Sequence, residues 1–117
     1  MIKLKQASEV LQPDQSAIVL FTHGENFSFD VSGKGSTGKW VLDPETVEKV
    51  DKVIIYVRRD YENVNRIFLG NFTDIRPSDI PDRYVIRFTA LKEVGKAEVN
   101  WPTFASAGKS PVSYVKG

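Results

Sequence analysis

Five short segments rich in β-branched and aromatic residues constrain the fold of this chain more than any other feature. They cover residues 17–22, 27–31, 53–57, 67–75 and 84–91. The segments 17–22 and 53–57 are continuously apolar, which predicts strands in the middle of a sheet. The segments 27–31 and 84–91 alternate between apolar and polar residues, which predicts strands with one buried face. The chain is therefore expected to be mainly β.

The loops and one glycine predict how these strands pair and bend. Sequential strands joined by short loops favour antiparallel pairing. Gly70 lies inside the segment 67–75, and a glycine within a strand indicates a bulge or a sharp bend, as small barrels use at their corners. With a closing strand at 112–115, the sequence predicts a small antiparallel barrel of five or six strands.

Short helices are expected beside the strands. Asp43 can cap a helix whose first residue is Pro44, and this helix is expected to end near Val50. Asn100 can cap a second helix over residues 101–105, and residues 8–11 fit a single helical turn. The predicted fold class is thus α+β with strands in the majority.

Composition narrows the class of protein. The 117 residues suit a single domain spanning residues 1–117. Cysteine is absent, which excludes a disulfide framework and a thiolate zinc site and fits a cytoplasmic location. No apolar run approaches the ~20 residues that span a bilayer, so a membrane is not an expected partner. The formal net charge of +1 does not by itself indicate a nucleic-acid binder.

The glycine-rich segment at residues 33–39 has the spacing of a phosphate-binding P-loop. That motif requires Ser or Thr after its lysine, whereas Trp40 follows Lys39, and a strand-like segment replaces the required helix. We therefore expect no hydrolysis of nucleoside triphosphates. A mobile loop is expected instead, in which Lys34 and Lys39 either meet a phosphate backbone or lie on an exposed connection without function.

Side chains for catalysis or metal binding are sparse. His23 is the only histidine, and no neighbouring motif supplies a nucleophile or a zinc ligand. The acids near residue 45 suit a helix start, where the helix dipole favours them. Neither a metal nor a cofactor is expected.

The two tryptophans are candidates for ligand contact. Trp40 and Trp101 each lie at the edge of a loop, where an indole either stacks on a flat ligand or covers one end of the core. The polar candidates for ligand contact are Ser28, Asp30, Thr37 and Asn100. The candidates for contact with a nucleic-acid backbone are Lys34, Lys39, Arg58 and Arg59.

The order of these segments resembles the PUA-like superfamily, particularly its EVE and ASCH branches. The matching parts are residues 17–22, Trp40, 50–56, 67–72 and 84–88, so the resemblance covers residues 17–94. It implies a five- or six-stranded pseudobarrel that binds nucleic acid, often through a modified or flipped base in an aromatic pocket. By position, Trp40 would lie beside that pocket and residues 33–39 at its rim.

Three functions remain open at this point. The first is a non-catalytic module that recognises modified DNA or RNA in defence or nucleic-acid modification. The second is a small ASCH-like hydrolase or ribonuclease, with Lys39, Tyr56 and Glu93 as candidate catalytic residues. The third is a protein-interaction module with an exposed sheet edge. A positive surface around a deep aromatic pocket would favour the first, and a flat apolar patch the third.

Overall fold

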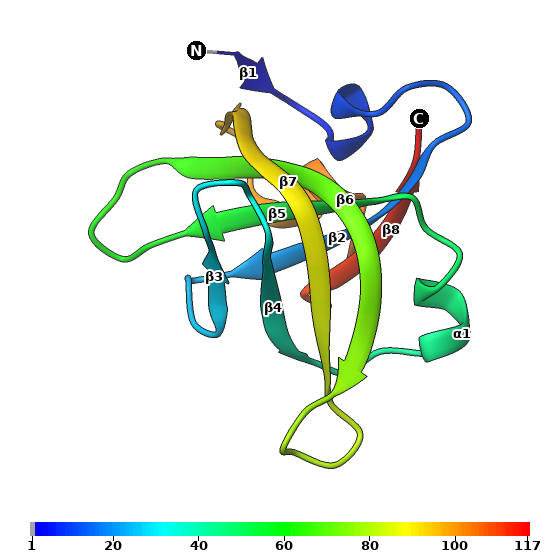
Figure 1. Cartoon of the computed structure of the whole chain (residues 1–117). Coiled ribbons are helices and arrows are strands. Elements are labelled where there is room, and N and C mark those ends of the chain that lie inside the picture. Colours follow the sequence, from blue (N-terminus) through cyan, green and yellow to red (C-terminus); the bar gives the residue numbers. More distant parts are fainter. Residues whose placement is uncertain (1) are drawn as a thin grey trace.

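The computed structural model describes residues 2–117, and these residues form eight strands in one mixed sheet (Figure 1). The strands are β1 (Lys3–Leu4), β2 (Ser16–Thr22), β3 (Phe27–Phe29), β4 (Gly35–Trp40), β5 (Lys52–Arg58), β6 (Asn65–Pro77), β7 (Tyr84–Ala97) and β8 (Val112–Lys116). Their order is β3-β4-β7-β6-β5-β2-β8, and β1 pairs with the far end of β7. The prediction of a mainly β protein with short helices is confirmed.

The strand number differs from the prediction, and the pairing is mostly but not entirely antiparallel. In the described chain there are eight strands instead of five or six, and two of the pairings are parallel. Strands β2 and β5 are parallel neighbours, in register from Ala17 opposite Lys52 to Thr22 opposite Val57. A parallel pair needs a long crossover connection, and here the chain forms β3, β4 and α1 between the two strands.

Strands β2 and β5 are apolar on both faces because each face packs against a different layer. Ile18 and Leu20 point into a core cluster shared by β2, β4, β5, β6 and β7. Ala17 and Val19 belong to a second cluster, which η1 (Ala7–Val10) and α2 (Trp101–Ala105) cover. Burial on both faces explains the continuous apolar runs.

Strands β6 and β7 are long and curve together across the sheet (Figure 1). Their register shifts between Leu69 and Asn71, so the predicted irregularity at Gly70 is confirmed. A Cβ atom at Gly70 would lie 2.9 Å from Leu91 Cδ1 and 3.1 Å from Thr89 O. Glycine therefore allows the close approach that bends this strand pair.

Residues 35–39 form strand β4, and the expectation of a loop there is wrong. Strand β4 pairs with β3 on one side and with β7 on the other. The preceding turn needs Gly33, which has φ of +85° and whose added Cβ would lie 2.4 Å from Leu91 N. Pairing on both sides outweighs the low strand preference of the two glycines in β4, Gly35 and Gly38.

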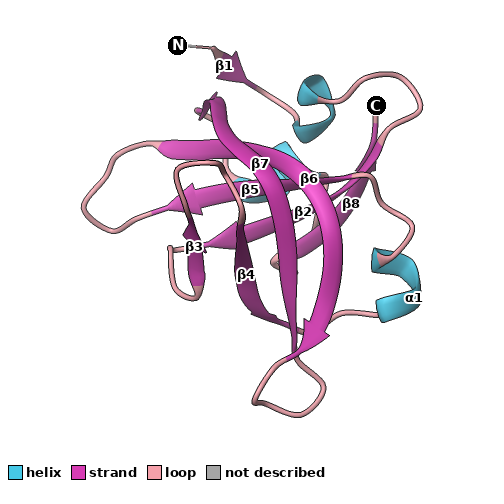
Figure 2. Cartoon of the chain, in the orientation of Figure 1, coloured by secondary structure: helices cyan, strands magenta, loops and turns pink. Residues whose placement is uncertain are grey.

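The short helices begin where the sequence predicted. The Asp43 side chain accepts a hydrogen bond from Glu45 N at 3.2 Å, at the start of α1 (Pro44–Val47). Asn100 caps α2 through Thr103 N at 3.3 Å. Helix α1 ends at Val47, earlier than the predicted end near Val50. Both η1 and α1 lie at the periphery of the sheet (Figure 2).

Candidate ligand groove

A groove of about 850 Å³ lies between the end of β2, strand β4 and the segment before β8. We call it the Trp40 groove. Its lining residues are Phe21, His23, Glu25, Asn26, residues 38–41, Ile80, Arg83 and residues 109–112. Its volume lies within the usual range for small-ligand pockets. Four separate parts of the chain build it, so only the tertiary fold brings these residues together.

Trp40 lines this groove and is also a core residue. Its side chain is 7% exposed and packs in the cluster that contains Ile86 and Phe88. The indole Nε1 donates a hydrogen bond to Thr37 Oγ1 at 3.3 Å, inside the protein. Trp40 and Thr37 therefore lie together, but Thr37 is fully buried and does not line the groove, and the indole leaves little of its flat face free.

Phe21 and His23 provide the accessible aromatic surface. Phe21 is half-buried and His23 is exposed, and their ring centroids lie 5.0 Å apart. His23 Nδ1 lies 2.7 Å from the carbonyl oxygen of Arg58. A carbonyl only accepts, so Nδ1 carries the proton and Nε2 of the neutral ring is an acceptor. The sequence analysis assigned Phe21 to a buried strand, and only its position at the strand end could have marked it as a site residue.

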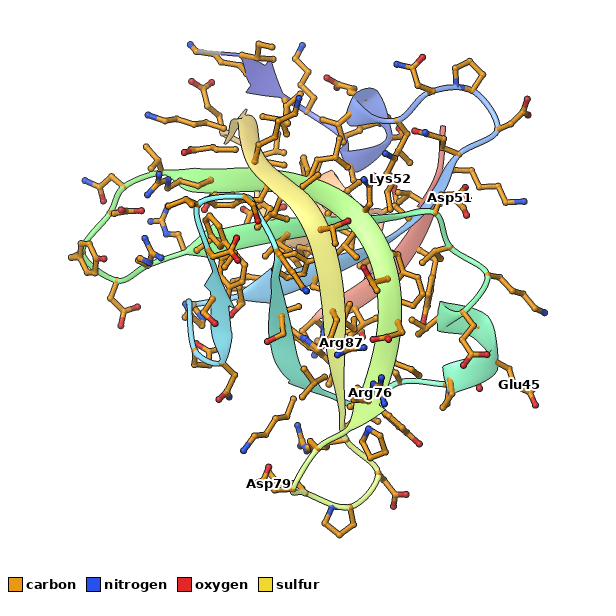
Figure 3. All side chains as sticks on the ribbon, in the orientation of Figure 1. Glu45, Asp51, Lys52, Arg76, Asp79 and Arg87 are labelled. Atoms are coloured by element: carbon orange, nitrogen blue, oxygen red, sulfur yellow. The ribbon has the colours of Figure 1, made fainter. Side chains whose placement is uncertain are left out.

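Three basic side chains surround the groove: Lys39, Arg83 and Lys109. Lys39 Nζ lies 2.7 Å from Asp79 Oδ1, and this contact lowers the pKa of the Asp79 carboxyl. Asp79 lies in the loop that joins β6 and β7 (Figure 3). Arg83 Nη1 from the same loop donates to Lys39 O at 3.2 Å. Lys39 was predicted as a site residue, whereas Arg83 and Lys109 were not, because they are distant from Trp40 in sequence.

One acidic residue, Glu25, also lines the groove. Its carboxylate accepts hydrogen bonds from Thr22 Oγ1 at 3.3 Å and from His23 N at 3.4 Å. These bonds hold the turn after β2. The lining side chains therefore combine three cations with one internally bonded carboxylate, and Asp79 offsets the charge of Lys39, so the excess of positive charge that favours an anionic ligand lies at Arg83 and Lys109.

A second cavity of about 340 Å³ adjoins the Trp40 groove. We call it the Arg58 cavity, and its lining residues are Phe21, Tyr56, Arg58, Asn65, Glu98, Asn100 and Trp101. Phe21 lines both cavities. The structure thus places the predicted residues Arg58, Asn100 and Trp101 beside the Trp40 groove instead of in it.

Trp101 also supports the wall of the Trp40 groove. Its side chain is buried, and Nε1 donates to Ser110 O at 2.7 Å. Ser110 is one of the lining residues of the groove. The hydrogen bond from Trp101 therefore anchors the segment before β8, which forms part of the groove wall.

Five of the predicted site residues line neither cavity, and one of them, Thr37, is fully buried in β4. Ser28, Asp30 and Lys34 lie on the hairpin of β3 and β4, and Arg59 lies 3.9 Å from Glu62 in the loop after β5. The Asp30 carboxylate accepts bonds from the backbone and side chain of its turn. The Ser32 hydroxyl, followed by the Lys34 amide, lowers the pKa of Asp30.

The three candidates for hydrolysis lie in different cavities. Lys39 lines the Trp40 groove, Tyr56 lines the Arg58 cavity, and Glu93 lines a third cavity beside Arg66. Burial raises the pKa of Tyr56, whose hydroxyl donates to Val99 O at 2.9 Å. Glu93 accepts two hydrogen bonds from Arg66, which lower its pKa. The structure does not assemble these three groups into one site.

Comparisons with known proteins returned no relative: no family, no curated protein and no solved structure matches the chain. Within residues 2–117, no group of three His, Cys, Asp or Glu side chains is placed to hold a metal ion. No helix in this same range has the length and apolar character needed to cross a membrane.

Proposed function

We propose that this protein is a non-catalytic nucleic-acid binding module that acts in the cytoplasm and takes an unpaired or flipped base into the Trp40 groove. The open sheet would then be a PUA-like pseudobarrel, with the groove beside β4 as its ligand site. The observation that carries the proposal is the combination of aromatic rings and three cations around one concavity.

The lining residues divide into two chemical sets. Lys39, Arg83 and Lys109 suit contacts with phosphates, which give affinity without reading a base. Phe21 and His23 offer ring surface for stacking on a base. A duplex cannot present a base to such a concavity without extruding it, which favours unpaired or flipped bases.

Polar and apolar groups at the groove would select the base. The amide of Asn26 offers both a donor and an acceptor, and the His23 ring offers a second polar group at Nε2. Val41 and Ile80 are 65% and 42% exposed and line the groove, so they would contact the apolar edge or a methyl group of a modified base. The separation of Lys39, Tyr56 and Glu93 favours this binding role over hydrolysis.

Binding to labelled DNA and RNA at several salt concentrations tests the proposal. The probes are single strands and duplexes with unmodified or methylated bases. Lys109→Ala and Arg83→Ala should each reduce the slope of log affinity against log salt by about 0.7–0.9. Lys92→Ala is the control, because Lys92 is exposed and lines neither cavity.

Two results would refute the proposal. One is the absence of binding to every probe at low salt. The other is an equal loss of affinity in Lys109→Ala, Arg83→Ala and the Lys92→Ala control, since that would place the nucleic acid elsewhere or show only non-specific attraction. Thermal melting of each variant establishes that the fold is intact.

A further inference from the structure

We infer that the ligand is a single strand that crosses Phe21, with one nucleotide in the Trp40 groove and a neighbouring nucleotide in the Arg58 cavity. This inference rests on the proposed function and specifies its substrate. Its basis is the adjacency of the two cavities and the position of Arg58.

Phe21 is the wall that the two cavities share. Its ring centroid lies 5.0 Å from that of His23, which lines the Trp40 groove. It lies 5.6 Å from that of Trp101, which lines the Arg58 cavity. A ligand that occupies both cavities would therefore contact this half-buried ring.

Arg58 contacts His23 of the Trp40 groove through its backbone, and its side chain lines the Arg58 cavity. Its carbonyl oxygen lies 2.7 Å from His23 Nδ1, and its guanidinium Nη1 donates to Asn65 Oδ1 at 3.2 Å. The ion pairs found within residues 2–117 do not include Arg58. A guanidinium has five N–H donors, so Arg58 retains donors for a phosphate between the two nucleotides.

The surface continues beyond Arg58 into a region with polar and charged side chains but no aromatic ring. Another cavity, of about 460 Å³, shares Arg58, Asn65 and Glu98 with the Arg58 cavity and adds Lys96. The negative charge of Glu98 would repel a phosphate there, but the Glu98 carboxylate lies 3.1 Å from Lys3 Nζ. A third nucleotide would thus meet Lys96 beside the Glu98 carboxylate, which is paired with Lys3.

The shared aromatic wall favours a single strand over a duplex. In a duplex, neighbouring bases stack on each other and pair with the opposite strand. A side chain between two neighbouring nucleotides requires those bases to separate, which costs free energy in a duplex and little in a flexible single strand.

A length series of single-stranded oligonucleotides, from one to six nucleotides, tests the inference. Affinity should rise at least about fivefold from one nucleotide to three, by stacking on Phe21 and contact with Arg58, and then level off. A paired duplex of the same sequence should bind more weakly than the single strand. Arg58→Ala should remove most of the gain with length.

Arg59→Ala is the matched control, because Arg59 adjoins Arg58 in sequence, lies near Glu62 and lines neither cavity. Arg58→Lys retains the positive charge but lacks the planar set of guanidinium donors, so it should keep part of the gain in affinity with length. It replaces Arg58→Ala as the test variant if Arg58→Ala lowers the melting temperature. Phe21→Leu preserves an apolar wall but removes the ring, and should also reduce the gain.

The outcomes separate the inference from the proposed function. If mononucleotides bind, but affinity is independent of length or Arg58→Ala equals Arg59→Ala, the inference is wrong and the proposed function stands. If a duplex binds as tightly as the single strand, the inference is also wrong. If no nucleic acid binds at low salt, both are wrong.

Discussion

His23 and Arg58 are joined at the ends of two parallel strands, with His23 Nδ1 at 2.7 Å from Arg58 O. The preceding residues, Thr22 and Val57, are partners in the register of β2 and β5. Because parallel strands end at the same edge of a sheet, the two residues after this pair meet there. The contact places a ring of the Trp40 groove against the backbone that carries the Arg58 side chain.

His23→Ala should destabilise the protein by about 0.5–1.5 kcal/mol, because it removes this hydrogen bond. His23→Asn should recover part of the loss, since its side-chain amide can donate to the same carbonyl. Urea unfolding of the three proteins measures the difference. Equal free energies of unfolding for the wild type and His23→Ala would show that the bond contributes nothing to stability.

Trp40→Ala should destabilise the protein by about 3–5 kcal/mol, because the indole is buried in the core cluster. Trp40→Phe should cost less, since it keeps most of the packing and loses the bond to Thr37 Oγ1. Thermal and denaturant unfolding test both. A small loss of stability in Trp40→Ala would contradict the core position of Trp40. Ligand affinities of these variants are comparable only where each variant is folded.

Trp101→Phe should loosen the segment before β8 by removing the bond from Nε1 to Ser110 O. We expect faster amide hydrogen exchange in residues 107–110 and a stability loss of about 1 kcal/mol. Hydrogen exchange read by mass spectrometry makes the measurement. Unchanged exchange in this segment, with the change confined to the core, would show that Trp101 does not support the groove wall.

The pair Arg66–Glu93 should make stability depend on pH. Arg66 Nε and Nη2 donate to the Glu93 carboxylate at 3.0 and 2.7 Å, which lowers its pKa below the ordinary value of 4.5. A lowered pKa stabilises the folded state above the ordinary value, and this contribution disappears as pH falls through the lowered one. Glu93→Gln should therefore cost about 1–2 kcal/mol near neutral pH and progressively less below about pH 4.5.

Unfolding across pH 2–7 compares this variant with Glu98→Gln as a control. Glu98 pairs with Lys3, and both side chains are largely exposed, so its loss should change stability little at any pH. A constant difference between wild type and Glu93→Gln over the whole range would contradict the assignment of this pH dependence to Glu93.

Much of the local structure could be predicted from nearest neighbours in the sequence. The caps at Asp43 and Asn100 lie where expected, because capping depends on residues only two or three positions away. The bulge at Gly70 was also predicted, since a glycine inside an apolar strand has few other roles. The resemblance to PUA-like proteins stays a prediction.

The two strands that the sequence did not predict, β4 and β1, depend on pairing with strands that are distant in the sequence. Residues 35–39 read as a flexible loop, yet they form β4 because β3 and β7 satisfy their backbone groups on both sides. Strand β1 is only two residues long and exists through its pairing with β7. Neither signal is present in the local pattern.

The sequence by itself determined that this chain would be mainly β, with two strands apolar on both faces and short capped helices. Those features follow from side-chain periodicity and local hydrogen bonding. Only the tertiary structure decided that β2 and β5 are parallel, that Trp40 is a core residue, and that Phe21, Arg83 and Lys109 share one groove. The physical reason is that strand partners and cavity walls are chosen by packing between segments far apart in the chain, which local patterns do not encode.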